Sequence, residues 1–528
     1  MLPLSVSFLM IAAACGGSDA SSTSDTSDTS AEIVEESDAE SVETEQSEPA
    51  APSTTAAPTT IPATTVPPTT VPAATVNLPT VAPAVGGTGV RATLSQAPLP
   101  EGWVEEEFIF GGTATSYAAT GTLTTDGIWD VEPGAEAEFA TRMIVRRPPA
   151  ADFSGVVAVE WFNVTAGTDT SPDWGYLAEE FERQGHVYVG VSVQEVGVNG
   201  VAESRLEGGL VDTRGLKAVD AERYGDLEHP GDAFSFDIMT QAGAVAAGLT
   251  DTDVLDGLEP TTVLAMGESQ SAIFLTTYVN AVHPVTQLFD GFLIHSRGSG
   301  APAPSGDRAT GADGVLIRED IGVPVFQYEA ETDLTALGFF AARQPDSEWV
   351  HTWEVAGTAH ADAYSLSVSI GTARNADLGA VIGCEVGVND GPHHETLQAA
   401  LSHLITWVQD GTSPPASPLI EIDDSSGAPV VVRDEDGIAL GGIRTPPVDA
   451  PLRVLSGDPS GEEGGFCFLF GQTIDLDGVA DRYADVDAYI AAFDASAAAA
   501  VESGWLLEAD AATMRAEELA RAEELLAT

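Results

Sequence analysis

Short apolar runs rich in Val, Ile, Phe and Tyr alternate along the middle of the chain with stretches whose apolar residues follow a helical period. The apolar runs predict strands at Thr141–Pro148, Gly155–Val164, His186–Gln194, Thr261–Gly267, Phe289–Ser296, Val323–Glu331 and Trp349–Gly357. The intervening stretches predict helices over Asp173–Gly185, Asp232–Gly248, Ser269–Val282 and Glu395–Gly411. Consecutive parallel strands need crossover segments, which helices supply. The alternation therefore predicts an α/β fold, with a mostly parallel central sheet and helices on both faces.

Two segments interrupt this alternation within the domain expected over residues 91–528. Residues 195–230 are Gly-rich and charged, and they form either a cap over a site or a surface loop. Residues 414–528 form a C-terminal extension rich in Pro and Gly, ending in an Ala/Glu-rich helix expected to pack on the surface.

The first residues have a different character from the rest. Residues 1–14 are an apolar run that ends in small residues before Cys15, which is typical of a lipoprotein signal; a short buried helix is the alternative. The run is too short to span a bilayer. Residues 15–90 are first acidic and then rich in Thr and Pro, so we expect a disordered tether. These features predict an exported protein at the cell surface, held to the membrane by a lipid on Cys15.

The charge balance is strongly acidic. The 528 residues carry 20 basic and 82 acidic side chains, a net charge of −62, and the only lysine is Lys217. Such a surface repels nucleic acid and anionic lipid headgroups, which excludes binding to either by charge. If Cys15 carries lipid, Cys384 and Cys467 remain, and outside the cytoplasm they can form a disulfide; two buried thiols are the alternative.

The sequence Gly267-Glu268-Ser269-Gln270-Ser271 lies where a predicted strand passes into a predicted helix. A sharp strand–turn–helix junction can expose a serine nucleophile, with the helix N-terminus aimed at a developing oxyanion. Ser269 is therefore the candidate nucleophile, and the Gln270 N–H is one half of the candidate oxyanion hole. Ser271 stands where this kind of turn usually has a second Gly.

A serine nucleophile needs a base and an acid, in the chain order Ser, Asp or Glu, His. Asp333 lies nine residues after Pro324, at the end of a predicted strand, with Glu331 as the alternative acid. His360 follows the last predicted strand and is the candidate base. The second oxyanion donor is expected from the backbone of Asn163 or Val164, after an earlier strand.

Other candidates are weaker. Arg297 either binds an acidic group on a substrate or pairs with a carboxylate of the protein. The adjacent His393 and His394 lack a partner pattern for a metal site, and none is predicted. No glycine-rich nucleotide motif occurs between a strand and a helix, so we expect no cofactor.

Several motifs together resemble a known family. They are VVAVEWFNVTAG, VYVGVSVQEVGV, HPGDAFSFDI, GESQSA, FDGFLIHSRG, EAETDL, WVQDGTSPP, GGIRTPPVDAPL and FCFLFGQT. Over nearly all of residues 91–483 the chain resembles bacterial exported alpha/beta hydrolase domain proteins, in which Ser at the position of Ser271 is typical. The resemblance implies an α/β-hydrolase fold and a serine hydrolase, in particular an ester hydrolase, without naming a substrate.

The sequence thus predicts a hydrolase that cleaves small-molecule carboxylic esters through an acyl-enzyme on Ser269, Asp333 and His360. Two alternatives stay open: an amidase or peptidase on the same three residues, and a non-catalytic surface binding protein that keeps the fold.

Overall fold

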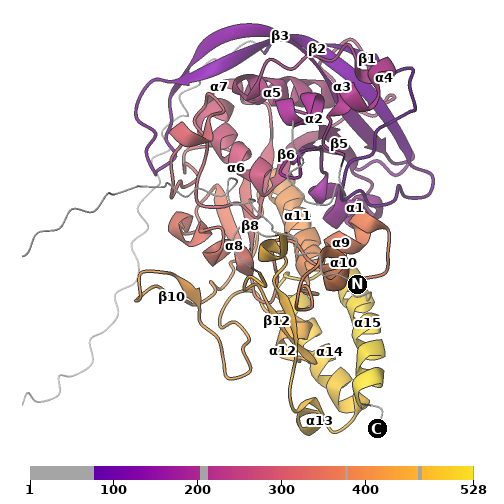
Figure 1. Ribbon diagram of the computed structural model, residues 1–528, viewed down its shortest axis with the longest axis vertical. Coiled ribbons are helices and arrows are strands. Elements are labelled where there is room, and N and C mark those ends of the chain that lie inside the picture. The colour runs from indigo at the N-terminus through magenta and orange to yellow at the C-terminus, as the bar shows by residue number, and fades with distance from the viewer. Residues whose placement is uncertain (1–75, 202–211, 375–377, 462–465, 527–528) are drawn as a thin grey trace, which may run out of the picture. The chain divides into compact units, whose positions relative to one another are not determined.

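A computed structural model describes residues 76–201, 212–374, 378–461 and 466–526 (Figure 1). Within these residues, nine strands form one central sheet in the order β1-β2-β3-β5-β4-β6-β7-β8-β9. The strands are β1 (Thr80–Pro83), β2 (Val104–Ala119), β3 (Val131–Arg147), β4 (Val156–Trp161), β5 (Val187–Val191), β6 (Thr262–Glu268), β7 (Gly291–His295), β8 (Val325–Ala330) and β9 (Val350–Val355). Strands β4 to β9 pair in parallel, whereas β1, β2 and β3 pair antiparallel. The predicted α/β fold with a mostly parallel sheet is confirmed.

The helices around this sheet come from the crossovers between its strands and from the chain that follows β9. They are α1 (Pro172–Gln184), α5 (Ser235–Ala246), α6 (Gln270–Thr277), α7 (His283–Thr286), α8 (Glu331–Thr335), α9 (Ala363–Ile370), α10 (Leu378–Ile382) and α11 (His393–Asp410). The helix predicted from Ser269 begins at Gln270 and changes to a π-helical turn at Tyr278–Val282. Helix α11 begins two residues before the predicted start.

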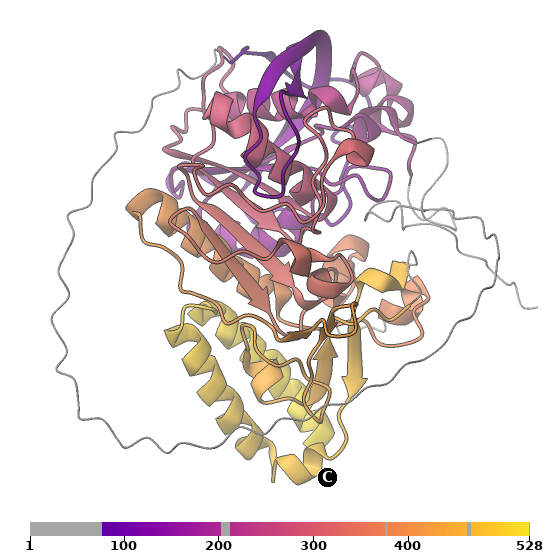
Figure 2. The ribbon, with the colours of Figure 1, turned by 90° about the vertical axis from the view of Figure 1, so that its left-hand side faces the viewer.

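Alternate side chains of the central strands build two cores, one on each face of the sheet. From β4, Val157 and Val159 pack with α5 and α6, whereas Val156 and Ala158 pack with α1 and α11. Both faces are thus apolar, which explains why the central strands read as continuous hydrophobic runs. The helices lie on opposite sides of the strands, as the two views show (Figures 1 and 2).

The N-terminal boundary of the folded part differs from the prediction. Strand β1 lies inside residues 15–90, which were expected to be tether, and pairs with β2 from Thr80 opposite Gly111 to Pro83 opposite Phe108. The Thr/Pro-rich composition hid this strand, because Thr and Val suit an edge strand as well as an extended linker. Residues 1–14, Cys15 and the rest of the expected tether up to residue 75 lie outside the described residues.

Residues 195–230, expected to be either a cap or a surface loop, are described except for 202–211. They contain α2 (Glu195–Asn199), α3 (Leu216–Val219) and α4 (Ala221–Tyr224). Val198, Leu216, Tyr224 and Leu227 form a small core of their own. The Tyr224 hydroxyl donates to Glu107 on β2 at 2.9 Å, so this part of the segment packs against the antiparallel end of the sheet.

The extension, residues 414–528, is folded over most of its length. It contains β10 (Ile422–Asp423), β11 (Val430–Val431), α12 (Pro446–Asp449), β12 (Arg453–Ser456), β13 (Gln472–Asp475), α13 (Val479–Arg482), α14 (Val486–Glu502) and α15 (Glu508–Leu526). Helices α14 and α15 pack against each other (Figure 2). The buried residues of α15, Asp510, Met514, Glu518 and Ala522, recur every four positions, so this helix buries one stripe and exposes the rest.

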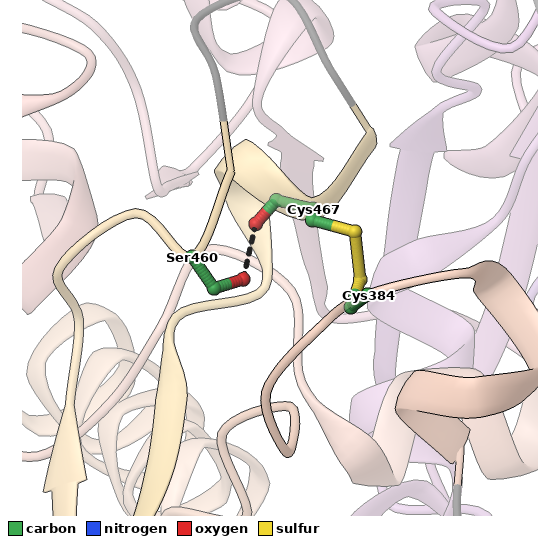
Figure 3. The surroundings of a disulfide bond; sticks show 3 residues. All are labelled: Cys384, Ser460 and Cys467. Atoms are coloured by element: carbon green, nitrogen blue, oxygen red, sulfur yellow. Dashed lines mark hydrogen bonds between the residues drawn. A yellow bond between two sulfur atoms is a disulfide. The ribbon is translucent and has the colours of Figure 1, made fainter.

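The predicted disulfide between Cys384 and Cys467 is confirmed (Figure 3). It joins the loop after α10 to a 3-10 turn, Phe466–Leu469, in the extension. The Ser460 hydroxyl donates to the Cys467 carbonyl at 2.9 Å (Figure 3). The bond ties the extension to the chain that follows β9.

Removing this bond is expected to destabilise the domain. It closes a loop between positions 83 residues apart, and a cross-link of that span limits the unfolded chain. We expect the Cys384→Ser/Cys467→Ser double variant to lose roughly 2 to 4 kcal/mol of unfolding free energy in a urea titration. Reductant should lower the stability of the parent by a similar amount and leave the double variant unchanged. Two titratable thiols in the unreduced, unfolded parent would contradict the bond.

Candidate active site

The turn between β6 and α6 holds Ser269 in an unusual backbone conformation. Ser269 has φ 58° and ψ −117°, in a region that residues other than Gly rarely adopt. Its N–H donates to the His295 carbonyl at the end of β7, 2.9 Å away, which holds the strained residue in place. Strain of this kind persists only where the surroundings enforce it, and it clusters at functional sites.

Small neighbours make this turn possible. A Cβ on Gly267 would lie 3.0 Å from the Ser271 hydroxyl and 3.0 Å from Leu275 Cδ1, so a larger residue here would force these side chains to shift. Ser271 replaces the usual second glycine, and its hydroxyl donates to the Glu268 carbonyl at 2.8 Å. The hydroxyl is thereby satisfied inside the turn, which explains in physical terms why Ser is accommodated there.

The three residues predicted as nucleophile, base and acid lie in one hydrogen-bonded line. His360 Nε2 is 2.8 Å from Ser269 Oγ, and His360 Nδ1 is 2.6 Å from Asp333 Oδ1. They come from the β6–α6 turn, the loop after β9 and the first turn of α8. Asp333 is fully buried and His360 nearly so, while Ser269 keeps partial exposure.

The two candidate acids have different environments. Asp333 Oδ1 contacts His360, and its other oxygen accepts the Ala330 N–H at 2.7 Å. Glu331 contacts neither Ser269 nor His360: its oxygens accept the N–H groups of Gly357 and Gly457, each at 2.9 Å, and the guanidinium of Arg433. Asp333 is therefore the acid that faces the candidate base.

The extension holds the loops that carry the acid and the base. The Thr332 hydroxyl donates to the Gly457 carbonyl at 2.6 Å, beside Asp333. The Ala361 N–H donates to the Leu469 carbonyl at 3.0 Å, beside His360. Residues far apart in sequence thus fix the spacing between Asp333 and His360.

The candidate oxyanion donors are not equally available. The Asn163 N–H donates to the Thr170 carbonyl at 3.0 Å. The Val164 N–H lies 3.3 Å from the side-chain oxygen of Gln270, near the long limit of a hydrogen bond. Gln270 is the first residue of α6, where a backbone N–H has no acceptor within its own helix. The Gln270 and Val164 N–H groups are therefore better placed than that of Asn163 to meet an oxyanion.

With this geometry in place, the comparison with known proteins is informative. A family model described as "Alpha/beta hydrolase domain" matches residues 65–516. The chain belongs to this alpha/beta hydrolase domain family. The resemblance drawn from the motifs is confirmed at the level of the family, while the bacterial and exported part of it stays a prediction. No curated protein matches the chain.

Solved structures that resemble this hydrolase domain do so at low identity. A putative dienelactone hydrolase from Klebsiella pneumoniae subsp. pneumoniae MGH 78578 is 12% identical, with a TM-score of 0.24, and the match covers 47% of this chain and 85% of that one. A glucuronoyl esterase from Solibacter usitatus is 8% identical, with a TM-score of 0.25, over 52% and 80% of the two chains. Esterase Est22 is 14% identical, with a TM-score of 0.25, over 51% and 79%.

A second carboxyl group lies beside the base of this alpha/beta hydrolase domain. Glu268 Oε1 is 3.1 Å from His360 Nε2, the same nitrogen that contacts Ser269. The Asn163 amide donates to Glu268 Oε2 at 3.2 Å and to the Glu268 carbonyl at 3.1 Å. Glu268 is only 7% exposed. Its contact with His360 was not predicted, although its position before Ser269 in the turn was the available signal.

A buried polar chain lies behind the turn and the base. Asp173 Oδ1 is 2.8 Å from His295 Nδ1, His295 Nε2 is 2.7 Å from His393 Nε2, and His393 Nδ1 is 2.8 Å from the Ala359 carbonyl. Ala359 precedes His360, and the carbonyl of His295 holds Ser269. This series of hydrogen bonds therefore supports both the loop that carries His360 and the turn that carries Ser269.

The direction of these bonds follows from the carbonyl at one end. It only accepts, so His393 carries its proton on Nδ1 and accepts at Nε2, and His295 donates to it. Burial lowers the pKa of His295 to about 3 and, with His295 beside it, lowers that of His393 well below its usual value, so both rings are neutral at pH 7. Burial raises the pKa of Asp173 to about 8, and its other oxygen has no hydrogen-bond partner within the described chain. A neutral, protonated Asp173 can donate to His295 Nδ1, and every hydrogen bond in this series then has one donor and one acceptor.

Arg297 is buried beneath the site, not open to it. It is 0% exposed; its Nε donates to Gln327 at 2.8 Å and an Nη to the Val315 carbonyl at 2.9 Å. Burial lowers its pKa to about 10, an effect that the nearby Glu329 opposes. These contacts place Arg297 among the structural groups of the domain.

The remaining candidates have local partners. His393 belongs to the buried chain, and His394 stacks on Tyr364 with 3.6 Å between ring centroids. In the part of the chain that the structure describes, no group of three or more His, Cys, Asp or Glu side chains is placed to hold a metal ion. Among the described helices, none combines the length and apolar character needed to cross a membrane.

The protonation of Asp173 can be tested by substitution. Because the Asn amide can donate to His295 Nδ1 as the protonated acid does, we expect Asp173→Asn to unfold in urea within about 1 kcal/mol of the parent. Asp173→Ala leaves a buried imidazole nitrogen unpaired and is expected to cost about 1 to 3 kcal/mol. If Asp173→Asn is instead as destabilising as Asp173→Ala, Asp173 is ionised and paired with an imidazolium.

Proposed function

We propose that this alpha/beta hydrolase domain is a serine hydrolase that cleaves carboxylic esters through an acyl-enzyme. The observation that carries the proposal is the unbroken line from Ser269 through His360 to Asp333, built on a strained turn at a helix N-terminus. Such a line is the arrangement that activates a serine for acyl transfer. Family membership supports the same class of reaction.

In the proposed reaction, Ser269 Oγ attacks the acyl carbonyl while its proton passes to His360 Nε2. Asp333 holds the His360 Nδ1–H and stabilises the imidazolium that forms. His360 then gives the proton to the leaving alcohol, and the acyl group stays on Ser269. Water, deprotonated by His360, attacks the acyl-enzyme and releases the acid and free Ser269. No cofactor takes part in these steps.

The oxyanion in this proposal is bound by the N–H groups of Gln270 and Val164. The Asn163 N–H is already used by Thr170, which supports Val164 over Asn163 as the second donor. The long contact from the Val164 N–H to the Gln270 side chain is weak enough for a full negative charge to replace it, because hydrogen bonds to charged groups are stronger.

Two other functions of the site remain open. An amidase or peptidase would use the same three residues, and turnover of an anilide would separate it from an ester hydrolase. A non-catalytic binding protein would keep the fold without an activated serine. The hydrogen-bonded line from Ser269 to Asp333 supports catalysis over binding alone.

The first test is covalent labelling of the domain, from residue 76 onward, with a fluorophosphonate. We expect intact mass to show one adduct on the parent and none on Ser269→Ala, because only an activated serine displaces fluoride from phosphorus. Ser271→Ala is the matched control, since its hydroxyl is bonded to the Glu268 carbonyl, and it should label like the parent. A folded parent that takes no label would favour the binding-protein reading.

The choice of acid gives a second test. We expect Asp333→Asn to reduce kcat on 4-nitrophenyl acetate by roughly 10³ to 10⁴, because an amide cannot hold the same imidazole tautomer or stabilise an imidazolium. Glu331→Gln removes the neighbouring carboxylate, which does not contact His360. It should lower the thermal stability, and it should reduce kcat of the folded protein much less than Asp333→Asn does. Equal losses of kcat in the two variants would contradict the assignment of Asp333.

We also propose that the protein is exported and held at the cell surface by a lipid on Cys15. The Cys384–Cys467 disulfide supports a compartment outside the cytoplasm, because disulfides persist in oxidising surroundings. The substrate in this proposal is a small-molecule ester, and the strong negative charge argues against nucleic acid as a partner.

A further inference from the structure

The proposed reaction uses one carboxylate on His360, but His360 contacts two. Asp333 Oδ1 is 2.6 Å from Nδ1, and Glu268 Oε1 is 3.1 Å from Nε2. Glu268 is the residue before the nucleophile, so the same strained turn fixes its backbone. Its far oxygen is held by the Asn163 amide, which keeps the carboxyl group directed at the imidazole.

The interaction between Glu268 and His360 changes from unfavourable to favourable during the reaction. Asp333 only accepts, so His360 carries a proton on Nδ1 and, when neutral, a lone pair on Nε2. An ionised Glu268 facing that lone pair is an acceptor against an acceptor, which is unfavourable. Once Nε2 has taken the proton of Ser269, the same contact becomes an ion pair with a hydrogen bond.

We infer that Glu268 is a second positioning carboxylate for His360, one that favours the imidazolium formed when Ser269 attacks. An interaction that strengthens as the reaction proceeds lowers the barrier, whereas one of constant strength does not. This inference rests on the proposed function, since it needs His360 to act as a base.

The proton balance of the step is simple. The Ser269 Oγ–H bond breaks as Oγ bonds to the acyl carbon, and the proton moves to His360 Nε2. The new N–H lies between Ser269 Oγ, at 2.8 Å, and Glu268 Oε1, at 3.1 Å, and can donate to either. The proton then leaves Nε2 for the leaving alcohol, and Glu268 ends the step in the protonation state in which it began.

Other titratable groups around His360 and Glu268 are buried with them. They are Asp333 on α8, Asp173 and Tyr176 on α1, His295 on β7 and His393 on α11. Burial lowers the pKa of His360, but Glu268 first and Asp333 second outweigh that effect and raise it to about 8. Burial also raises the pKa of Glu268 to about 8, against the opposing effect of His360, so the ionised Glu268 of this inference is the form present on the plateau above that pH. The rate of the parent should therefore fall as the pH drops below about 8.

The test is the pH dependence of kcat/KM for 4-nitrophenyl acetate in the parent and in Glu268→Gln. The variant removes the charge and keeps the shape of the side chain. We expect the acidic limb to move to lower pH by about one unit, because the imidazolium loses a partner. We also expect kcat on the plateau to fall about tenfold, the factor that corresponds to one unit of pKa.

A purely structural role of Glu268 would lower the plateau of the pH profile and leave its acidic limb at the same pH. An acidic limb at the same pH in Glu268→Gln and in the parent would therefore overturn the inference. Glu180→Gln is the matched control: it removes a buried carboxyl that contacts Arg183 instead of His360, and its limb should match the parent. Glu268→Asp keeps the charge and withdraws it, so its limb should lie between those of the parent and Glu268→Gln. It also serves if Glu268→Gln does not fold.

Failure of this inference is distinguishable from failure of the proposed function. If the folded parent takes no fluorophosphonate label, the proposed function fails and the inference fails with it. If the parent is labelled and active but Glu268→Gln titrates like the parent, only the role of Glu268 is refuted. The rate of labelling against pH gives the same limb without any ester substrate.

Discussion

The buried carboxylate of Glu331 joins the parts of the chain on which the site depends. It is the first residue of α8, directly after β8. It accepts a backbone N–H from Gly357 after β9 and another from Gly457 in the extension, and it pairs with Arg433. Three segments distant in sequence therefore meet at one side chain that is 1% exposed. A buried carboxylate is tolerated only where charge-assisted hydrogen bonds replace water. Because Asp333 follows it by two residues and His360 follows Gly357 by three, these bonds also fix the acid and the base relative to each other.

The extension thus belongs to the site as much as the hydrolase sheet does. The sheet places Ser269, Asp333 and His360 at the carboxyl ends of β6, β8 and β9, as parallel α/β folds commonly do. The sheet alone leaves the loops after β8 and β9 without lateral support. That support comes from Gly457 and Leu469, and the Cys384–Cys467 bond keeps the segment around Leu469 close to the chain that follows β9.

The central strands and the three aligned residues could be predicted from sequence because both depend on local pattern. Strands buried on both faces are continuous apolar runs, and a nucleophile turn favours a small residue two positions before its serine, here Gly267. The second half of β3 coincides with the strand predicted at Thr141–Pro148, but β2 and the first half of β3 escaped prediction; that half of β3 is largely exposed and rich in Glu, with no apolar run to mark it. Helix α14 escaped for a related reason: it is rich in Ala and buries few residues, among them Tyr489 and Phe493. Arg433 pairs with Glu331, and Arg453 with Glu518. These partners lie far apart in the chain, and a single sequence does not reveal such pairs.

The crowding of acids around His360 could not be predicted either, and it raises a physical question. Glu268, Asp333 and Asp173 lie close enough to affect one another, and three full negative charges in a buried space would repel. The arrangement is tolerable if protons reduce the charge. Asp173 holds one as a neutral acid that donates to His295. The repulsion that remains, between Glu268 and Asp333, is relieved when His360, which contacts both, takes the proton of Ser269. All three acids contact an imidazole, so their different tasks follow from their second partners: Glu268 also accepts from the Asn163 carboxamide and Asp333 from the Ala330 N–H, whereas the second oxygen of Asp173 has no hydrogen-bond partner among the described residues.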